Sequence, residues 1–367
     1  MHVMTILGTR PEIIRLSRII PKLDACCEHT VVHTGQNADD RLSSIFFDEL
    51  EVRAPCHFLD VGGDGFAPQA GRILERVDAI LAADRPDRVL ILGDTNSALS
   101  AIVAKRRGIP VFHMEAGNRC RDDRVPEEVN RRIVDHCSDV LLPYTERSRE
   151  NLLREGFAGN RIFVTGNPIA EVLSHYRDRI DASTVLQRLG LEDDAYFLVT
   201  LHRAENVDAP DRLAQILASV ADLARHYGHP AIVSAHPRLR SRLQATGRDL
   251  PAALQLHPPF GLFDFVRLEK HAFCVLSDSG TVQEECTILQ VPSVTLRDVT
   301  ERPETLECGA NILAAADTAS VARATALARS SSQEWNIPPE YSRLRVSDTV
   351  VKLVAGHHHG IGGNVCP

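Results

Sequence analysis

The sequence has few aromatic residues and no long uninterrupted apolar run. Aromatic side chains make up 5% of the 367 residues, and there is one Trp. No apolar stretch approaches the roughly 20 residues that a membrane-spanning helix needs. The N-terminus enters an expected strand at once, without the basic head and apolar stretch of a signal peptide. The lack of a membrane-spanning run and of a signal peptide predicts a cytoplasmic protein.

The cysteines follow no disulfide or metal-binding pattern. There are nine of them, one pair is adjacent (Cys26 and Cys27), and no CxxC motif occurs. Reduced thiols are the interpretation that this pattern favours. His357 to His359 lie in a Gly-rich tail that begins at about residue 356, and no HExxH or Cys/His ligand spacing is present. We therefore expect no metal site.

The chain also lacks an excess of positive charge. Its formal net charge is -8 at pH 7, which argues against general binding to nucleic acid. An anionic ligand would therefore have to be held by a local group of basic side chains.

The length and the order of apolar runs predict two α/β domains. A chain of 367 residues, 44% hydrophobic and 25% charged, is too long for one ordinary core. Strands are expected at 2–7, 30–33, 88–92, 109–114, 140–144, 161–165, 197–200, 231–234, 272–276 and 291–296. Helices are expected at 13–23, 70–83, 97–107, from 126, at 146–155, 212–226 and 281–289, and from 320.

Polar residues follow nearly every expected strand at its carboxyl end. This alternation predicts two Rossmann-like, doubly wound parallel sheets whose functional rims face a cleft. We place the N-terminal domain at 1–170 and the C-terminal domain at 171–367, and we expect a charged helical stretch after residue 168 to cross between them.

The stretch from Phe112 to His136 gathers carboxylates and arginines around two expected turns. Glu115 follows an apolar strand, the usual place for a site residue in an open α/β sheet. Pro126 suits the first turn of a helix and would place Glu127 and Glu128 at its positive end. Arg131 and Arg132 stand four residues after these glutamates, so surface ion pairs are the alternative interpretation.

Other polar groups fall on the same expected rims. Asp94 and Arg10 each follow a strand of the first domain. A larger basic set could neutralise a diphosphate, although each member could equally be a solvated surface charge. It comprises Arg10, Arg15, His202, His236 and Arg302.

Ser279, Gly280 and Thr281 begin an expected helix in the second domain. The free N–H groups and positive end of such a helix can hold phosphate oxygens, and Gly280 would let the anion approach closely. An ordinary capped helix is the alternative. Glu285 lies one turn further, where a carboxylate could accept two ribose hydroxyls, whereas Glu284 suits an exposed face.

Phe260 and Phe265 could form an apolar wall for a base, beside Pro258 and Pro259. Core packing is the alternative use of either phenylalanine.

Seven motifs stand in the order and spacing of a known family, between about residue 3 and residue 315. They are GTRPE at 8–12, GDTNS at 93–97, HMEAGNR at 113–119, PEEVNR at 126–131, HRAENV at 202–207, SDSGTVQEE at 277–285 and TERPE at 300–304. The chain thus resembles the non-hydrolysing UDP-N-acetylglucosamine 2-epimerases, which have two Rossmann-like domains in a glycosyltransferase-B-like arrangement.

The resemblance implies roles for individual residues. Asp94, Glu115, Glu127 and His202 match the family's catalytic group. The matching UDP-holding set is Arg10, His236, Phe265, Ser279, Gly280, Glu285 and Arg302. A homodimer is implied as well, together with a UDP-sugar substrate and no cofactor or metal.

The family's reaction inverts C2 of an N-acetylhexosamine although the C2 proton is not acidic. UDP leaves C1 as the C2 proton is removed, which gives a 2-acetamidoglucal, and re-addition with a proton on the other face gives the epimer. This route needs two acid/base groups and a firmly held diphosphate. We assign Glu115 and Glu127 to the proton transfers, with Asp94 tuning them.

The chain departs from the common family pattern in ways that leave the sugar open. Arg15 stands where many members have lysine, and HTGQN, GNRC and AKRRGIP are closer to a branch that acts on UDP-2-acetamido-2,6-dideoxy-L-talose and makes UDP-N-acetyl-L-fucosamine. We expect interconversion of UDP-N-acetylglucosamine and UDP-N-acetylmannosamine, with the L-talose sugar as the alternative. A hydrolysing 2-epimerase, a glycosyltransferase and a non-catalytic nucleotide-sugar sensor are further alternatives.

Overall fold

The computed structural model describes residues 1–36, 40–63, 65–246, 250–330 and 334–357. Its contacts group the chain into two compact units. The first comprises Met1–Gly117, Val129–Glu171 and Leu344–Pro367, and the second comprises Asn118–Glu128 and Val172–Arg343. Compared with the predicted division at residue 170, the second unit gains 118–128 and the first gains the chain from Leu344 onward.

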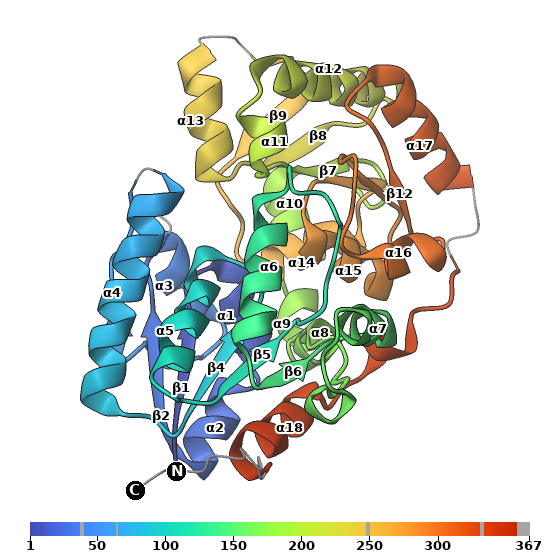
Figure 1. Cartoon of the computed structure of the whole chain (residues 1–367). Helices are drawn as coiled ribbons and strands as arrows, with labels where there is room; N and C mark the ends of the chain where they lie inside the picture. Colours follow the sequence, from blue (N-terminus) through green and yellow to red (C-terminus); the bar gives the residue numbers. More distant parts are fainter. Residues whose placement is uncertain (37–39, 64, 247–249, 331–333, 358–367) are drawn as a thin grey trace, which may run out of the picture. The chain divides into compact units, whose positions relative to one another are not determined.

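A parallel six-stranded sheet forms the centre of the first unit (Figure 1). Its strand order is β3-β2-β1-β4-β5-β6, so the order reverses between β1 and β4. The strands are β1 (His2–Leu7), β2 (Glu28–His33), β3 (His57–Phe58), β4 (Arg88–Leu92), β5 (Val111–Met114) and β6 (Val140–Leu142). The reversal point is the usual position of a ligand site in such sheets.

Helices connect these strands. They are α1 (Arg10–Leu16), α2 (Ile20–Cys26), α3 (Asp40–Glu49), α4 (Phe66–Asp84), the 3₁₀ turn η1 (Asn96–Ser100), α5 (Ala101–Arg106), α6 (Pro126–Cys137), α7 (Glu146–Arg154), the 3₁₀ turn η2 (Gly159–Arg161) and α8 (Ile169–His175). Helices α6 and α8 each contain residues of both units.

The second unit repeats this plan around another parallel six-stranded sheet, in the order β12-β11-β10-β7-β8-β9. Its strands are β7 (Phe197–Thr200), β8 (Ala231–Ser234), β9 (Leu254–His257), β10 (Cys274–Ser277), β11 (Ser293–Thr295) and β12 (Asn311–Leu313). Its helices are α9 (Arg177–Asp181), α10 (Val185–Leu189), α11 (Ala204–Val207), α12 (Pro210–Tyr227), α13 (Pro237–Thr246), α14 (Leu262–Lys270), α15 (Gly280–Leu289), α16 (Pro303–Glu307), α17 (Thr318–Ser330) and the 3₁₀ turn η3 (Pro339–Ser342). The prediction of two doubly wound parallel sheets is confirmed.

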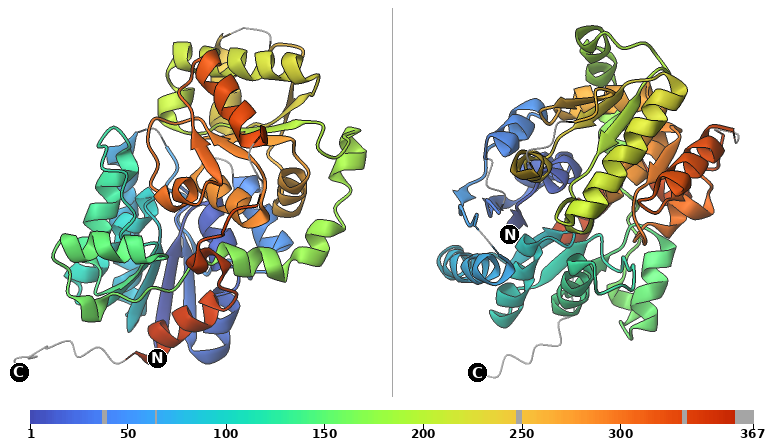
Figure 2. Two further views of the ribbon diagram at one scale, coloured as in Figure 1. Left: turned by 90° about the vertical axis from the view of Figure 1, so that its right-hand side faces the viewer. Right: turned by 90° about the horizontal axis from the view of Figure 1, so that it is seen from above.

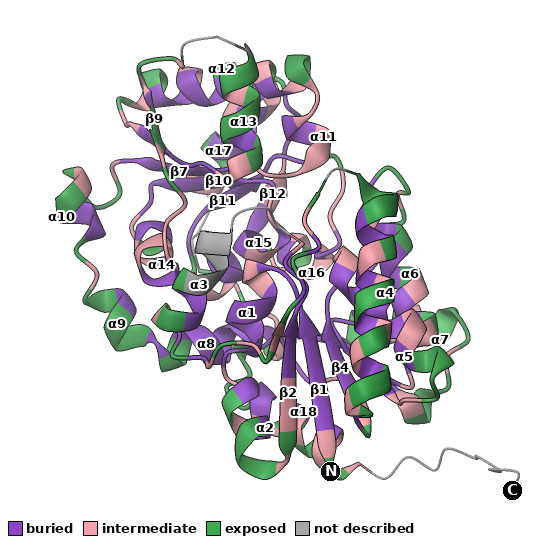
Figure 3. Cartoon of the chain, turned by 90° about the vertical axis from the view of Figure 1, so that its left-hand side faces the viewer, coloured by how far each residue is buried: buried purple, intermediate pink, exposed green. Residues whose placement is uncertain are grey.

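The central strands are apolar along most of their length because helices cover both faces of a parallel sheet. All five residues from Val3 to Leu7 of β1 are buried, as are all four of β5 and of β7. Figure 3 shows β1 and β4 as mostly buried and the outer side of α4 as exposed. The polar side chains of the rim therefore follow directly on buried strands.

The last described elements of the chain return to the first unit. They are α18 (Val346–Val351) and the π-helical turn η4 (Lys352–Gly356), which contribute the buried side chains Val346, Val350 and Val354. Lys22 Nζ lies 2.6 Å from Asp348 Oδ1, and Ser347 N donates to Glu171 Oε2 at 2.8 Å. Figure 2 shows this red segment beside the blue elements of the first unit. His358 and His359 of the predicted tail lie outside the described residues.

Two expected elements differ from the structure. The single helix predicted at 13–23 is wrong: α1 ends at Leu16 and α2 starts at Ile20, with Pro21 in its first turn, where a missing N–H is tolerated. The strand predicted at 161–165 is reduced to one bridge, between Ile162 and Leu141, after the turn η2. In the described part of the chain, no helix is long and apolar enough to cross a membrane.

Candidate active site

The ends of β4 and β5 bring two predicted catalytic carboxylates of the first unit to the same rim. Leu92 is paired with Met114 in the register of these strands, so Asp94 and Glu115 each follow closely on neighbouring strand ends. Gly93 N donates to Met114 O at 3.1 Å and ties the two ends together.

Asp94 is held by an arginine that the sequence did not single out as its partner. Arg131 Nε donates to Asp94 Oδ2 at 2.8 Å, and the Arg131 side chain is 2% exposed. Asn130 Nδ2 donates to the main-chain oxygen of Asp94 at 2.9 Å. Both donors come from α6, so the PEEVNR motif positions the acid of the GDTNS motif.

Glu115 is buried and forms an ion pair with Arg15, which is buried as well. Its backbone has φ 67°, in the left-handed region that a non-glycine residue adopts at a cost of about 1–3 kcal/mol. Such conformations persist where the surrounding structure fixes them, and they cluster at functional sites. Arg15 was predicted as one of the basic residues for a diphosphate, and its pairing with Glu115 was not predicted. Its guanidinium also lies 5.5 Å from the centre of the Tyr144 ring.

Glu12 of the GTRPE motif is a rim carboxylate that sequence reasoning missed. It accepts hydrogen bonds from Thr9 N at 3.0 Å and Thr95 Oγ1 at 2.7 Å. Burial raises its pKa to about 7, against the opposing effect of these hydrogen bonds. Arg10, two residues earlier, is partly exposed and lies 5.5 Å from the centre of the Phe46 ring.

The two glutamates at the start of α6 have different environments within the second unit. Glu128 is 1% exposed and accepts hydrogen bonds from Cys120 N and Arg121 N, both at 3.0 Å, so a surface ion pair does not describe it. Glu127 is partly exposed, and its Oε1 lies 2.9 Å from Arg203 Nη1. Arg203 was not predicted as a site residue, although it directly follows His202 in the HRAENV motif.

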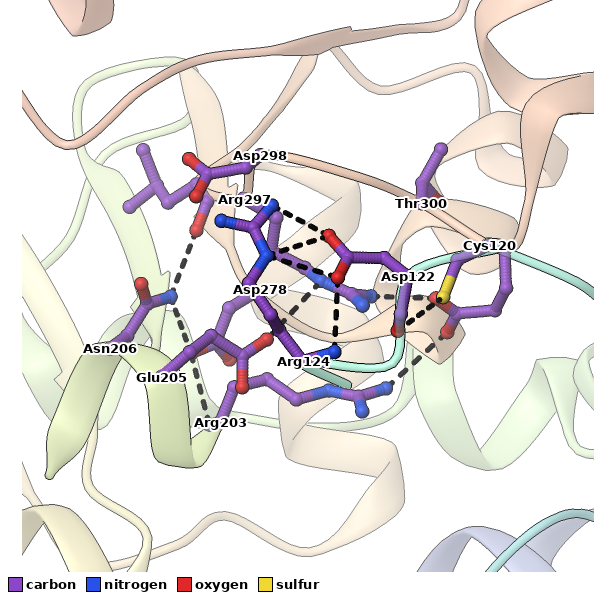
Figure 4. Close-up of polar contacts among 12 residues, drawn as sticks. Cys120, Asp122, Arg124, Arg203, Glu205, Asn206, Asp278, Arg297, Asp298 and Thr300 are labelled. Carbon is purple, nitrogen blue, oxygen red and sulfur yellow. Dashed lines mark hydrogen bonds and ion pairs between the residues drawn. The ribbon is translucent and has the colours of Figure 1, made fainter. Parts of the chain in front are cut away.

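A buried carboxylate, Asp278, positions the predicted histidine of the second unit, His202. Figure 4 shows Asp278 together with Arg203 and Asn206. Asp278 accepts from His202 N at 3.0 Å, Arg203 N at 3.1 Å and Asn206 Nδ2 at 3.1 Å. Burial would raise the pKa of this carboxyl, but the neighbouring His202 and the N–H donors outweigh burial and lower it to about 2. The His202 ring Nδ1 lies 3.1 Å from Asp278 Oδ1, so the aspartate fixes the histidine at main chain and side chain.

The register of the second sheet explains this arrangement. Ser277 is paired with Thr200, which brings the residues after β10 beside those after β7. The ring centres of His202 and His236 are 5.9 Å apart. The predicted catalytic histidine, His202, therefore lies close to the predicted UDP-binding histidine, His236. Asp278 could have been suspected from its place in the SDSGT motif.

The start of α15 carries the predicted phosphate-binding residues. Ser279 is the residue before the helix, and Gly280 and Thr281 open it. A Cβ at Gly280 would lie 2.8 Å from Glu301 Oε1 and 3.2 Å from the Arg302 guanidinium carbon, so only glycine fits without displacing these groups.

Arg302 is buried among carboxylates rather than solvated. Its Nε donates to Glu284 Oε1 at 3.0 Å, and its Nη1 lies 2.9 Å from Glu301 Oε1. Glu284 is 1% exposed, so the prediction that it occupies an exposed face is wrong, and the Arg302 side chain that pairs with it is buried as well. Glu301 also pairs with Arg297 at 2.9 Å, and neither Glu301 nor Arg297 was predicted.

The remaining predicted residues belong to the second unit as well. Phe260 and Phe265 are partly buried and pack against the core cluster that contains Tyr196 and Leu268, which agrees with their core-packing interpretation. Glu285 is 3% exposed on α15. Contact with a base or a ribose remains a prediction for these three side chains.

Comparison with known proteins identifies relatives that match most of the chain. A family model described as UDP-N-acetylglucosamine 2-epimerase matches residues 22–355. A Methanocaldococcus jannaschii protein named UDP-N-acetylglucosamine 2-epimerase is 39% identical over 364 residues, covering 96% of this chain and 99% of the relative. A Pseudomonas aeruginosa protein named UDP-2,3-diacetamido-2,3-dideoxy-D-glucuronate 2-epimerase is 35% identical, covering 86% and 89%.

A solved structure shares the fold. The crystal structure of the Methanocaldococcus jannaschii UDP-GlcNAc 2-epimerase in complex with UDP-GlcNAc and UDP superposes with a TM-score of 0.92. The two chains are 38% identical in that comparison, which covers 96% of this chain and 99% of the other.

Proposed function

The chain belongs to the UDP-N-acetylglucosamine 2-epimerase family, and on this premise we propose that it inverts C2 of UDP-N-acetylglucosamine to give UDP-N-acetylmannosamine. The observation that carries the proposal is the pair of strand-end carboxylates Asp94 and Glu115, each held by its own buried arginine. Relatives of the same family carry names that include UDP-GlcNAc and a diacetamido uronate, so the family leaves a choice of sugar.

The proposed reaction is an elimination followed by an addition. A carboxylate takes the C2 proton, the C1–O bond to UDP breaks, and a C1–C2 double bond forms, giving 2-acetamidoglucal and UDP. In the second half, UDP re-forms the C1–O bond and C2 receives a proton on the opposite face. Atoms and charge balance over the two halves, and the net change is inversion at C2.

Glu115 and Glu127 are the proposed acid/base pair. The ion pair with Arg15 fixes the position of the Glu115 carboxylate at the end of β5, and this carboxylate is the proposed acceptor of the C2 proton. Glu127 lies beside Arg203 and is partly exposed, so its carboxyl can exchange protons. Asp94, paired with Arg131, would tune the field at the rim, and His202 would stabilise the departing diphosphate charge.

The proposed binding residues for UDP belong to the second unit. The start of α15 offers the positive end of a ten-residue helix, with Ser279 preceding it and Gly280 as its first residue. Arg302 brings a guanidinium next to Gly280, which supports diphosphate binding at this point.

The test is C2 proton exchange in deuterium oxide, followed by NMR. Wild-type protein should incorporate deuterium at C2 of UDP-N-acetylglucosamine, and Glu115→Gln and Glu127→Gln should each lower that rate by roughly 10²- to 10⁴-fold. Glu146→Gln, at an exposed position at the start of α7, is the matched control and should exchange at the wild-type rate. Wild-type exchange in both Glu115→Gln and Glu127→Gln would end the assignment.

The same assay chooses between substrates and reaction types. UDP-2-acetamido-2,6-dideoxy-L-talose and UDP-2,3-diacetamido-2,3-dideoxy-D-glucuronate would be supplied beside UDP-N-acetylglucosamine at equal concentration. The largest kcat/KM identifies the preferred sugar. Stoichiometric release of free UDP would indicate a hydrolysing enzyme instead of the proposed isomerase.

Two further features of the protein are part of the proposal. We infer a homodimer, which sedimentation of the purified protein would test through its mass, and a cytoplasmic location, which fractionation of the source cells would test. The net charge of -8 supports the expectation that nucleic acid is not a partner.

A further inference from the structure

Asp135 and His113 form a buried pair directly behind the strand ends of the first unit. The two side chains are 0% and 1% exposed, and His113 Nδ1 lies 2.8 Å from Asp135 Oδ1. Asp135 comes from α6 and His113 from β5. Neither side chain belongs to the proposed acid/base group.

The pair contacts the backbone on both sides of the carboxylates. His113 Nε2 donates to Gly93 O at 2.9 Å, at the residue just before Asp94. Asp135 Oδ2 accepts from Gly117 N at 3.1 Å, two residues after Glu115. One aspartate therefore reaches the end of β5 directly and the end of β4 through the imidazole.

Both strand ends have backbone conformations that need such support. Gly93 has φ 79°, Glu115 φ 67° and Gly117 φ 79°, so each end turns through the left-handed region. At Gly117 an added Cβ would collide with Ser148 O, which keeps the turn tight. Glu115 N donates to Leu142 O at 3.1 Å, and the Gly117 to Asp135 bond holds the other end of the same turn.

The two ring nitrogens of His113 contact different groups. Gly93 O can only accept, so the Nε2 proton lies in that contact. The other ring nitrogen, Nδ1, is hydrogen-bonded to the Asp135 carboxyl. A small side chain at position 135 that cannot form these hydrogen bonds would remove the support from the ends of both β4 and β5.

We propose that Asp135 and His113 are positioning residues that set the orientation of Asp94 and Glu115 for C2 proton transfer. The inference rests on the proposed epimerase function. A shift of about 1 Å in a reacting group can cost roughly 10²-fold in rate. The pair should therefore govern kcat more than KM, since the proposed UDP seat belongs to α15.

The first test compares Asp135→Ala with Asp135→Asn. Asparagine can accept from Gly117 N through its oxygen and donate to Nδ1 of a neutral His113 through its amide, so the geometry is kept. We expect Asp135→Ala to lower kcat about 10²-fold with KM within about threefold of wild type. Asp135→Asn should restore kcat to within about tenfold of wild type.

The second test separates the two contacts of the histidine. A His113→Asn amide reaches the place of Nδ1 and keeps the Asp135 contact, whereas a His113→Gln amide reaches the place of Nε2 and keeps the Gly93 contact. If the contacts of His113 with Asp135 and with Gly93 are both needed, kcat should be about tenfold or more lower in both variants than in wild type. Wild-type kcat in both would overturn the inference.

A matched control addresses loss of packing. Val134→Ala removes buried volume from the same helix, next to Asp135 and without a polar contact to either strand end. The inference holds if Val134→Ala lowers the melting temperature as much as Asp135→Ala but keeps wild-type kcat. It is overturned if Asp135→Ala keeps wild-type kcat, or if Val134→Ala loses kcat equally. Failure of wild-type protein to exchange the C2 proton of any supplied sugar would instead count against the proposed function.

Discussion

Arg131 donates from Nε to Oδ2 of Asp94 at 2.8 Å, and its Nη2 lies 2.7 Å from the same oxygen. Two nitrogens of one guanidinium thus converge on a single carboxylate oxygen. Such a planar fork fixes the direction of the carboxylate as well as its charge.

Replacing Arg131 by lysine should lower kcat about tenfold or more, because an ammonium group keeps the charge but not the fork. Steady-state kinetics would measure the change. Arg132→Lys, at the exposed neighbouring position of α6, is the control and should leave kcat unchanged. Equal kinetics for Arg131→Lys and wild type would show that the geometry of the fork does not matter.

The stability of the first unit should fall as pH rises from about 4.5 to about 7. The pKa of Glu12 is raised from 4.5 to about 7 in the folded protein, so the folded state binds a proton that the unfolded state has released. The stabilisation is complete below about pH 4.5 and is lost as pH rises through about 7. Hydrogen exchange of β1 amides at pH 5 and pH 8, corrected for intrinsic rates, would follow it.

The comparison for this pH effect is Glu12→Gln. Its amide oxygen can accept from Thr9 N and its NH₂ can donate to Thr95 Oγ1, so it resembles the protonated acid. The difference in stability between wild type and Glu12→Gln should therefore depend on pH. A difference that is constant from pH 5 to pH 8 would contradict the prediction.

Asp278→Asn should destabilise the second unit at pH 7 by about 2 kcal/mol, because the folded state lowers the pKa of Asp278 from 3.8 to about 2. The contribution is present above about pH 3.8 and disappears as pH falls through about 2. Trp335, the one Trp of the chain, lies in this unit, so its fluorescence in urea reports the unfolding. Asp211→Asn, at an exposed position at the start of α12, should cost less than about 1 kcal/mol.

Gly8→Ala should lower the melting temperature, because its Cβ would collide with Ser97 Oγ and Thr34 Oγ1 behind the β1 to α1 turn. Overpacking of this kind costs about 1–3 kcal/mol. Gly71 provides the opposite case: it is exposed on α4, and a Cβ added there would meet no atom of the described residues within 4 Å. Gly71→Ala should stabilise by about 0.5–1 kcal/mol, and calorimetry would compare the two variants.

The sheet class and the strand-end acids could be predicted from sequence for two reasons. The strands of a parallel sheet are apolar runs, and the polar residues that come directly after them lie at the same edge of the sheet. The short edge strands β3, β9 and β12 could not: two central residues of β9, Gln255 and Leu256, are exposed and show no apolar run. Pairing in such strands depends on neighbours that are distant in sequence.

The residues that form ion pairs with the acidic side chains could not be predicted from the sequence either. Arg131 stands four residues after Glu127 and fits a helix-surface pair, yet the structure joins it to Asp94, 37 residues away. Glu284 was predicted to be exposed because α15 was considered alone, without Arg302 from a later segment. Motif order indicated which residues matter, whereas tertiary contacts decide what each one touches.

The return of α18 to the first unit has a consequence for biosynthesis. Val346, Val350 and Val354 are buried in a unit whose strands, which end at Leu142, leave the ribosome long before these valines. The apolar surface of the first unit that these valines contact therefore stays exposed at least until the second unit has been translated. A chain stalled on the ribosome before codon 344 should hold a first unit that is more sensitive to protease than the same unit in the completed and released chain.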